Sequence, residues 1–285
     1  MRRIGALLLL VIAGLSGCSR QMPPGRVAAW LPDQPQAGGE ITLFYNPAVP
    51  GAVLVNETGL TAEMLIMRTS EPPILTELPM TQKDGVWRTH HLLPAEGQFF
   101  LLRFAANGKT DDNGGRCWEG ILHGREMRPL RGAHLQKSLL LQQGGAGGFP
   151  FRQSLSEAET ELEAELALYP DNLEAKTALW DLLLRRSPLA STKERVRNEL
   201  RQIYENAGGD EETLAALLPF FFRTGQEYAA RQIIAESVAL LPRGPVAAAA
   251  RRREIEREQD PIKKASMIEA YNKEFPQQGL WRQLP

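Results

Sequence analysis

The sequence predicts a chain of two domains, an all-β sandwich followed by an all-α domain. Residues 40–143 contain short apolar runs separated by turns rich in Asn, Pro and Gly, at the spacing of an antiparallel sandwich. Residues 144–150 include four glycines, and beyond them apolar residues recur at the three- and four-residue spacings typical of helices. The character of the sequence therefore changes near residue 150, where we place the domain boundary.

The first 17 residues have the organisation of a secretory signal peptide. Residues 1–3 carry two arginines, and residues 4–14 form an apolar run too short to span a bilayer. The run ends in Leu15-Ser16-Gly17-Cys18, which resembles the lipobox of bacterial lipoprotein precursors. This resemblance implies cleavage before Cys18 and attachment of acyl chains, palmitate among them, to that residue. Two other interpretations stay open: an ordinary signal peptide with a coincidental cysteine, and a short membrane anchor.

Lipid on Cys18 would hold the protein on a membrane of the cell envelope, because two or three acyl chains make release negligible. By resemblance to Gram-negative precursors, Ser19 favours the outer membrane, with the folded part facing the periplasm or the exterior. Beyond residue 17 the chain has 31 basic and 34 acidic side chains, a near balance that argues against nucleic-acid binding. Cys117 is the other cysteine of that chain, so neither an internal disulfide nor a Cys-x-x-Cys redox pair is expected.

Residues 18–39 are rich in Pro, Gly, Gln and Ala, which predicts a tether that lifts the folded part off the lipid surface. The sandwich is expected over residues 40–143. Residues 99–102 (FFLL) are apolar on both sides and predict a central strand. Together with that run we expect seven strands, at residues 40–45, 52–56, 63–69, 86–92, 99–105, 117–123 and 135–141.

Residues 144–150 are expected to be a flexible glycine-rich linker, and residues 151–285 a domain of about seven helices. Three segments in this part end alike, at Pro170, Pro242 and Pro276, which lie 72 and 34 residues apart. The longer spacing is about twice the shorter one, so the repeat period is near 34 to 36 residues. This period and the segment Leu168-Tyr169-Pro170-Asp171-Asn172 resemble the tetratricopeptide repeat, which implies stacked helical hairpins. An irregular helical bundle is the alternative.

A second resemblance concerns the β-domain. Residues 78–81 (LPMT), 85–87 (GVW) and 111–115 (DDNGG), followed by Trp118, resemble the immunoglobulin-like starch-binding module of family 25. The resemblance implies an immunoglobulin-like sandwich that binds a glycan. Its site residues would be the hairpin tryptophan, the loop and the following aromatic, namely Trp87, Asp111, Asp112, Asn113 and Trp118.

Two departures weaken this transfer. Asp112 stands where the family usually has Asn, and residues 55–60 lack the second aromatic platform. The Asp/Asn/Gly loop is also what a sandwich uses for a tight turn, so a structural turn and a site for a cation or another ligand stay open beside sugar binding.

Most of the chain beyond residue 17 also resembles the N-terminal part of bacterial lipoproteins that carry a C-terminal thioredoxin-like domain. Here a sandwich and helical repeats occur, but the sequence given stops at Pro285 without such a domain, so the redox function is not transferred.

Phe220, Phe221 and Phe222 cannot all face one helical core. At least one is therefore expected to contact a neighbouring helix, a groove or a partner, and we treat the three as candidate interaction residues.

We expect a non-catalytic, membrane-anchored scaffold or adaptor that binds an envelope protein or peptide on the concave face of stacked hairpins. The alternatives are a glycan-binding lipoprotein and an accessory to a separate thioredoxin-like envelope protein. No Gly-x-Ser-x-Gly, phosphate-loop or His-Glu-x-x-His motif occurs, and the four histidines lack the spacing of metal ligands. Neither catalytic residues nor a metal or cofactor is therefore expected.

Overall fold

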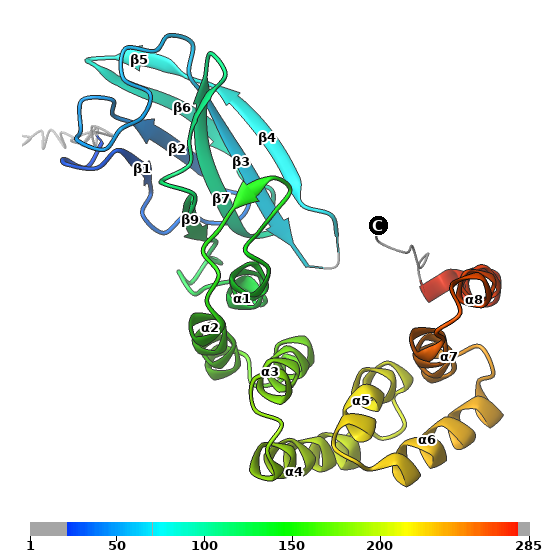
Figure 1. Ribbon diagram of the computed structural model, residues 1–285. Helices are drawn as coiled ribbons and strands as arrows, with labels where there is room; N and C mark the ends of the chain where they lie inside the picture. Colours follow the sequence, from blue (N-terminus) through cyan, green and yellow to red (C-terminus); the bar gives the residue numbers. More distant parts are fainter. Residues whose placement is uncertain (1–21, 70, 279–285) are drawn as a thin grey trace, which may run out of the picture.

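The computed structural model describes residues 22–69 and 71–278 of the chain, and it confirms the predicted fold class. A β-domain comes first and an α-helical domain follows (Figure 1). The predicted signal peptide, Cys18 and Ser19 lie outside the described residues.

The β-domain consists of two antiparallel sheets. The first has the strand order β1 (Ala28–Leu31), β2 (Glu40–Tyr45), β6 (Val86–Leu92) and β5 (Thr81–Lys83). The second has the order β4 (Ile74–Pro79), β3 (Thr61–Arg68), β7 (Gly97–Ala106) and β8 (Lys109–Asp111), with β9 (Trp118–Ile121) on another part of β7. Their facing sides enclose the first hydrophobic core.

Strand β7 lies in the middle of the second sheet, as the apolar run of residues 99–102 predicts, because it pairs with β3 on one side and with β8 and β9 on the other. Phe100, Leu102 and Phe104 point into the sandwich. Phe99 and Leu101 point the other way, into a second core that they share with helices. Strand β7 is thus buried on both faces.

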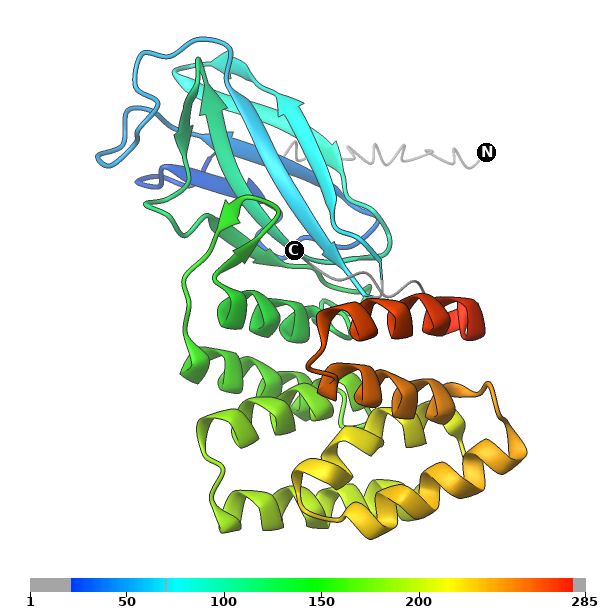
Figure 2. The ribbon, with the colours of Figure 1, turned by 45° about the vertical axis from the view of Figure 1, so that its right-hand side comes forward.

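Eight α-helices follow among the described residues. They are α1 (Ala133–Gln143), α2 (Leu155–Leu168), α3 (Leu173–Arg186), α4 (Ala190–Asn206), α5 (Glu211–Arg223), α6 (Glu227–Leu240), α7 (Pro245–Arg257) and α8 (Pro261–Glu274). Helix α1 covers the outer face of the second sheet, and α2 and α3 extend the same core. Figure 2 shows the remaining helices stacked below the sandwich.

The helices form a curved array (Figure 1). Helices α3, α5 and α7 lie on its inner side, whereas α4 and α6 lie outside. Asn172 and Asp210 cap α3 and α5 by accepting hydrogen bonds from Ala175 N and Thr213 N, which explains why these helices begin there. The first residues of the three inner helices are 38 and 34 residues apart, close to the period in the sequence.

The prediction of a strand at residues 135–141 was wrong, because this segment is part of α1. A short apolar run does not distinguish a buried strand from a buried helix by periodicity alone. Gly132 and Gly144, both with positive φ, mark the two ends of the helix.

The prediction of a flexible linker at residues 144–150 was also wrong. The segment folds into a hairpin of β10 (Gly145–Ala146) and β11 (Phe149–Pro150), and Phe149 is buried in the second core. Gly145 has a φ of 131°, and a Cβ there would lie 2.2 Å from the carbonyl oxygen of Phe149, so glycine serves close backbone packing.

Three smaller corrections concern the sandwich. Residues 52–56 form no strand, although Leu54 is buried. Strand β4 was missed because two prolines precede it and Pro79 is its last residue, and prolines argue against a strand. Strand β1 lies within residues 18–39, so the tether is shorter than predicted.

A cluster of charged side chains joins the two domains beside the second core. Glu119 on β9 pairs with Lys137 on α1 at 3.5 Å and with Arg152 at 3.1 Å. Lys137 in turn binds Glu161 on α2 at 2.8 Å. Burial alone would raise the pKa of Glu161, but hydrogen bonds from His134 and Lys137 outweigh it and lower that pKa. The ionised cluster therefore fixes the sandwich to the first helices.

Replacing Phe99 by Ala should lower the free energy of unfolding of the whole chain by about 3–5 kcal/mol, because Phe99 is fully buried where sheet and helices share a core. Tryptophan fluorescence and circular dichroism should report one shared denaturant transition. The control Leu75→Ala removes a side chain that is 52% exposed and should shift the midpoint little. Two separate transitions in the native protein would contradict the shared core.

Candidate functional site

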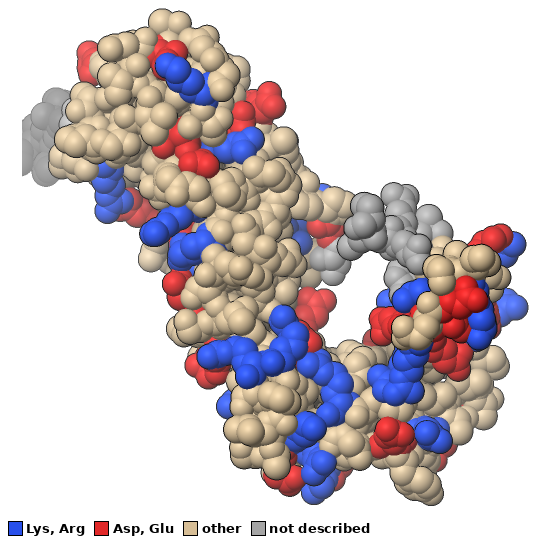
Figure 3. Space-filling model, in the orientation of Figure 1, with Lys and Arg blue, Asp and Glu red and all other residues tan. Residues whose placement is uncertain are grey.

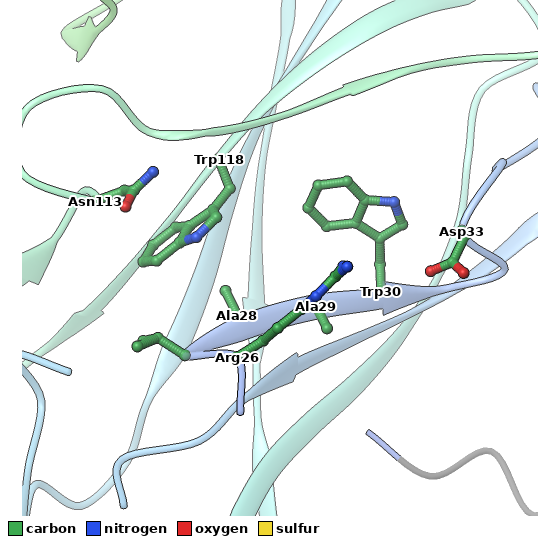
Figure 4. A pocket seen from close by; sticks show the side chains of 8 residues that line it. Arg26, Ala28, Ala29, Trp30, Asp33, Asn113 and Trp118 are labelled. Atoms are coloured by element: carbon green, nitrogen blue, oxygen red, sulfur yellow. The ribbon is translucent and has the colours of Figure 1, made fainter. Parts of the chain in front are cut away.

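A pocket of about 520 Å³ opens at one edge of the sandwich. Strand β1 is the edge strand of the first sheet, and β9 pairs only with β7 among the described strands, so the two sheets separate between them. Trp30 on β1 and Trp118 on β9 both line the opening (Figure 4). The pocket therefore has an indole from each sheet.

Each indole packs against a phenylalanine ring of the sandwich core. Trp30 meets Phe100 edge-on at 5.2 Å between ring centroids, and Trp118 meets Phe104 edge-on at 5.4 Å. Each tryptophan is half-buried, so part of each ring stays accessible. The pocket thus has two preorganised aromatic walls.

Three polar side chains complete the lining, namely Arg26, Asp33 and Asn113. In Figure 4 the Arg26 side chain runs below the two indoles and ends beneath Trp30, with Asp33 beyond Trp30 and Asn113 beyond Trp118. All three are exposed. The arrangement can bind an amphipathic molecule that presents an apolar face to the rings and polar groups around it.

Two of the five predicted ligand residues, Trp118 and Asn113, lie in this pocket. Trp87 does not, because it is only 7% exposed and belongs to the sandwich core. Its assignment as a sugar platform was therefore wrong. A tryptophan near the start of a strand can point to either face of the sheet, and in β6 Trp87 points into the sandwich core.

Asp111 holds the fold together and is not available to a ligand. It is 2% exposed, and its carboxylate accepts hydrogen bonds from Tyr45 Oη at 2.7 Å, Val53 N at 3.0 Å and Asn113 N at 3.2 Å. Burial, with the negative charge of Asp111, raises the pKa of Tyr45, so this phenol stays a hydrogen-bond donor.

Asp112 also acts within the loop. Its carboxylate accepts the Gly115 N–H at 2.8 Å, and its carbonyl oxygen accepts the N–H groups of Arg116 and Cys117. Asn113, Gly114 and Gly115 all have positive φ. These bonds are those of a tight turn whose function is to place Asn113 and Trp118 at the pocket.

Cys117 is buried beside the pocket, and it has no reactive thiolate. Burial raises the pKa of its thiol to about 12, and the negative charge of Asp112 adds to the effect. It packs in the second core as a small apolar residue.

The three phenylalanines of α5 divide between two roles. Phe220 and Phe221 are buried in a third core, formed by α3 to α7. Phe222 is half-buried, and the Arg253 guanidinium lies 3.6 Å from its ring centroid. None of them is an exposed hydrophobic anchor.

A second cavity, a groove of about 350 Å³, lies between α5 and α7. Half of its lining residues are alanine or proline, among them Ala215, Ala216, Pro219 and Ala249. No residue of α6 lines it, although α6 packs against both helices from outside. The groove therefore opens on the inner side of the curve, whose hollow is visible in Figure 3.

Trp30, Arg26 and Asp33 were missed because they lie in the proline-rich segment predicted to be a tether. One signal was present: residues 27–31 (VAAWL) are five consecutive apolar residues, which is long enough for an edge strand. Prolines on both sides concealed it.

Within the described residues, no three His, Cys, Asp or Glu side chains are grouped to hold a metal ion. Among the same residues, every helix is too short or too polar to cross a membrane. The chain matches no protein-family model, no curated protein and no solved structure.

Asp111→Ala should lower the free energy of unfolding by about 2–4 kcal/mol, since it removes a buried acceptor shared by three donors. Asp33→Ala is the matched control, because Asp33 is exposed and should change stability by less than about 0.5 kcal/mol. Urea unfolding measures both. Equal stability of the two variants would show that Asp111 does not support the loop.

Proposed function

We propose that this protein is a membrane-anchored lipoprotein that acts as a non-catalytic scaffold or adaptor in the bacterial cell envelope. The groove between α5 and α7 carries the proposal. It lies on the inner side of a curved array of helical hairpins, and the alanines and prolines in its lining leave room for an extended peptide segment.

The composition of the groove indicates how a partner would bind. Arg252, Arg253, Glu212 and Glu256 stand around the alanines and prolines, so both signs of charge are present. Figure 3 likewise shows mixed charge over the helices. A protein segment with apolar side chains and polar backbone fits such a surface better than a polyanion does.

The anchor is inferred from residues 1–18, which have the basic start, apolar run and cysteine of a lipoprotein precursor. In a Gram-negative cell, Ser19 after the cysteine favours the outer membrane.

Cys18→Ala should move the protein from the membrane pellet to the soluble fraction of lysed cells, because no acyl chain could then be attached to this position. The measurement is immunoblotting after ultracentrifugation, with metabolic labelling by a fatty-acid probe. Cys117→Ala is the control and should leave both signals unchanged. Retention of the Cys18→Ala protein in the pellet, with equal labelling, would contradict the anchor.

Ala249→Trp should abolish capture of partner proteins by light crosslinking in a membrane fraction, because the indole would fill the groove between α5 and α7. Ala235→Trp places the same side chain on the exposed outer helix α6 and should capture the same partners as the native protein. Circular dichroism checks that both variants fold. Unchanged capture by Ala249→Trp would exclude this groove as the binding surface.

Glycan binding is a second candidate function. The observation that favours it is the pair of half-buried indoles, Trp30 and Trp118, with polar side chains around them. Sugar rings stack on such indoles through their apolar face. Helices attached to the same rigid body could then hold a protein beside the bound glycan.

A further inference from the structure

We propose that the pocket between Trp30 and Trp118 binds an acidic saccharide, whose ring stacks on an indole and whose carboxylate pairs with Arg26. The inference rests on the second candidate function, glycan binding, and specifies its ligand.

The aromatic walls select a ring with an apolar face. Trp30 and Trp118 come from different sheets and are each held edge-on by a core phenylalanine, so the gap between them is set by the sandwich. A pyranose presents C–H groups on one face and hydroxyls at its edge. Such a ring could stack on either indole while its hydroxyls point outward.

The ends of the pocket can bind those hydroxyls. The Asn113 amide nitrogen donates to the carbonyl oxygen of Cys117 at 3.2 Å, which orients the side chain and leaves its oxygen as an acceptor. Asp33 makes no hydrogen bond or ion pair within the described part of the chain. Saccharide hydroxyls can donate to both acceptors, whereas a purely apolar ligand makes no hydrogen bond with them.

Arg26 decides the charge of the ligand. Its side chain lines the pocket together with both indoles and ends below Trp30 in the view of Figure 4, and it forms no ion pair or hydrogen bond with any described residue. A sugar on the indoles would displace water from this guanidinium, which then needs an acceptor. A carboxylate matches its planar array of donors, whereas a neutral sugar offers only hydroxyl oxygens.

Asp33 limits the number of acidic groups. It is the other charged side chain of the lining, and in Figure 4 it lies beyond Trp30, on the side away from Trp118. A carboxylate near Arg26 gains from the cation, whereas a second one near Asp33 would be repelled. The pocket therefore fits a saccharide with one carboxylate per bound ring.

The test is isothermal titration calorimetry of the full chain in detergent micelles, with tetragalacturonate as the acidic probe. Maltotetraose supplies a neutral ring and sodium acetate a carboxylate without a ring. We expect tetragalacturonate to bind, more weakly at high salt, and maltotetraose and acetate to bind at least about tenfold more weakly, which corresponds to about 1.4 kcal/mol.

Arg26→Gln should weaken tetragalacturonate binding about tenfold or more, the effect of losing one charge-assisted hydrogen bond. Arg201→Gln is the matched control on the exposed face of α4 and should change nothing. Trp118→Ala should remove binding. Because Trp118 also packs on the core, the thermal unfolding of the Trp118→Ala protein is measured as well. If that variant does not fold, the Arg26→Gln variant still tests the proposal, because Arg26 is exposed.

Equal affinity for the acidic and neutral probes, or no effect of Arg26→Gln, would overturn the acidic ligand and leave glycan binding in place. Absence of binding by both saccharides would overturn glycan binding as well. Neither result bears on the adaptor function, which the Ala249→Trp crosslinking experiment tests separately.

Discussion

Strand β7 is buried on both faces, and the arrangement of the remaining elements follows from that constraint. Its even-numbered side chains from Phe100 to Phe104 fill the sandwich, and Phe99 and Leu101 fill the core beneath it. An apolar sheet face left in water would be unfavourable, at about 25 cal/mol for each Å² of exposed apolar surface. Helix α1 must therefore lie on this face, and the rest of the helical array is built outward from α1.

The contacts between the sandwich and the first helices also follow from the apolar outer face of β7. The glycine-rich segment leaves α1 and returns at once to cover the second core with Phe149, which a flexible linker could not do. Lys137 and Glu161 place charges at the margin of this core, where partial burial strengthens their attraction. The sandwich and helices α1 to α3 consequently share one core, which fixes their relative position.

The parts of the fold that were predicted correctly are those with long, regular patterns of apolar residues in the sequence. The double-sided apolar run of β7 and the helical spacing beyond residue 151 are examples. Short segments were assigned less well, because tertiary contacts decide them. Residues 135–141 are helical since they lie across a sheet face, and β1 is a strand since β2 offers it a free edge.

The candidate site was predicted in part for a related reason. The loop that carries Asn113 and Trp118 has a recognisable sequence, so these two residues were found. Asp111 and Trp87 have the right chemical types but point inward, and sequence alone does not give the direction of a side chain at a turn. The other half of the pocket comes from a strand 80 or more residues earlier, and only folding brings it to the loop.

The position of β1 so near the start of the chain also determines what the pocket can reach. Arg26 follows Cys18 by eight residues, which span at most about 30 Å when fully extended. If lipid on Cys18 is embedded in a bilayer, the pocket can reach only ligands in a thin layer next to the lipid headgroups. Molecules deeper in the envelope would have to come to this layer to be bound, and the anchor would then act as a spatial filter that works before any chemical recognition.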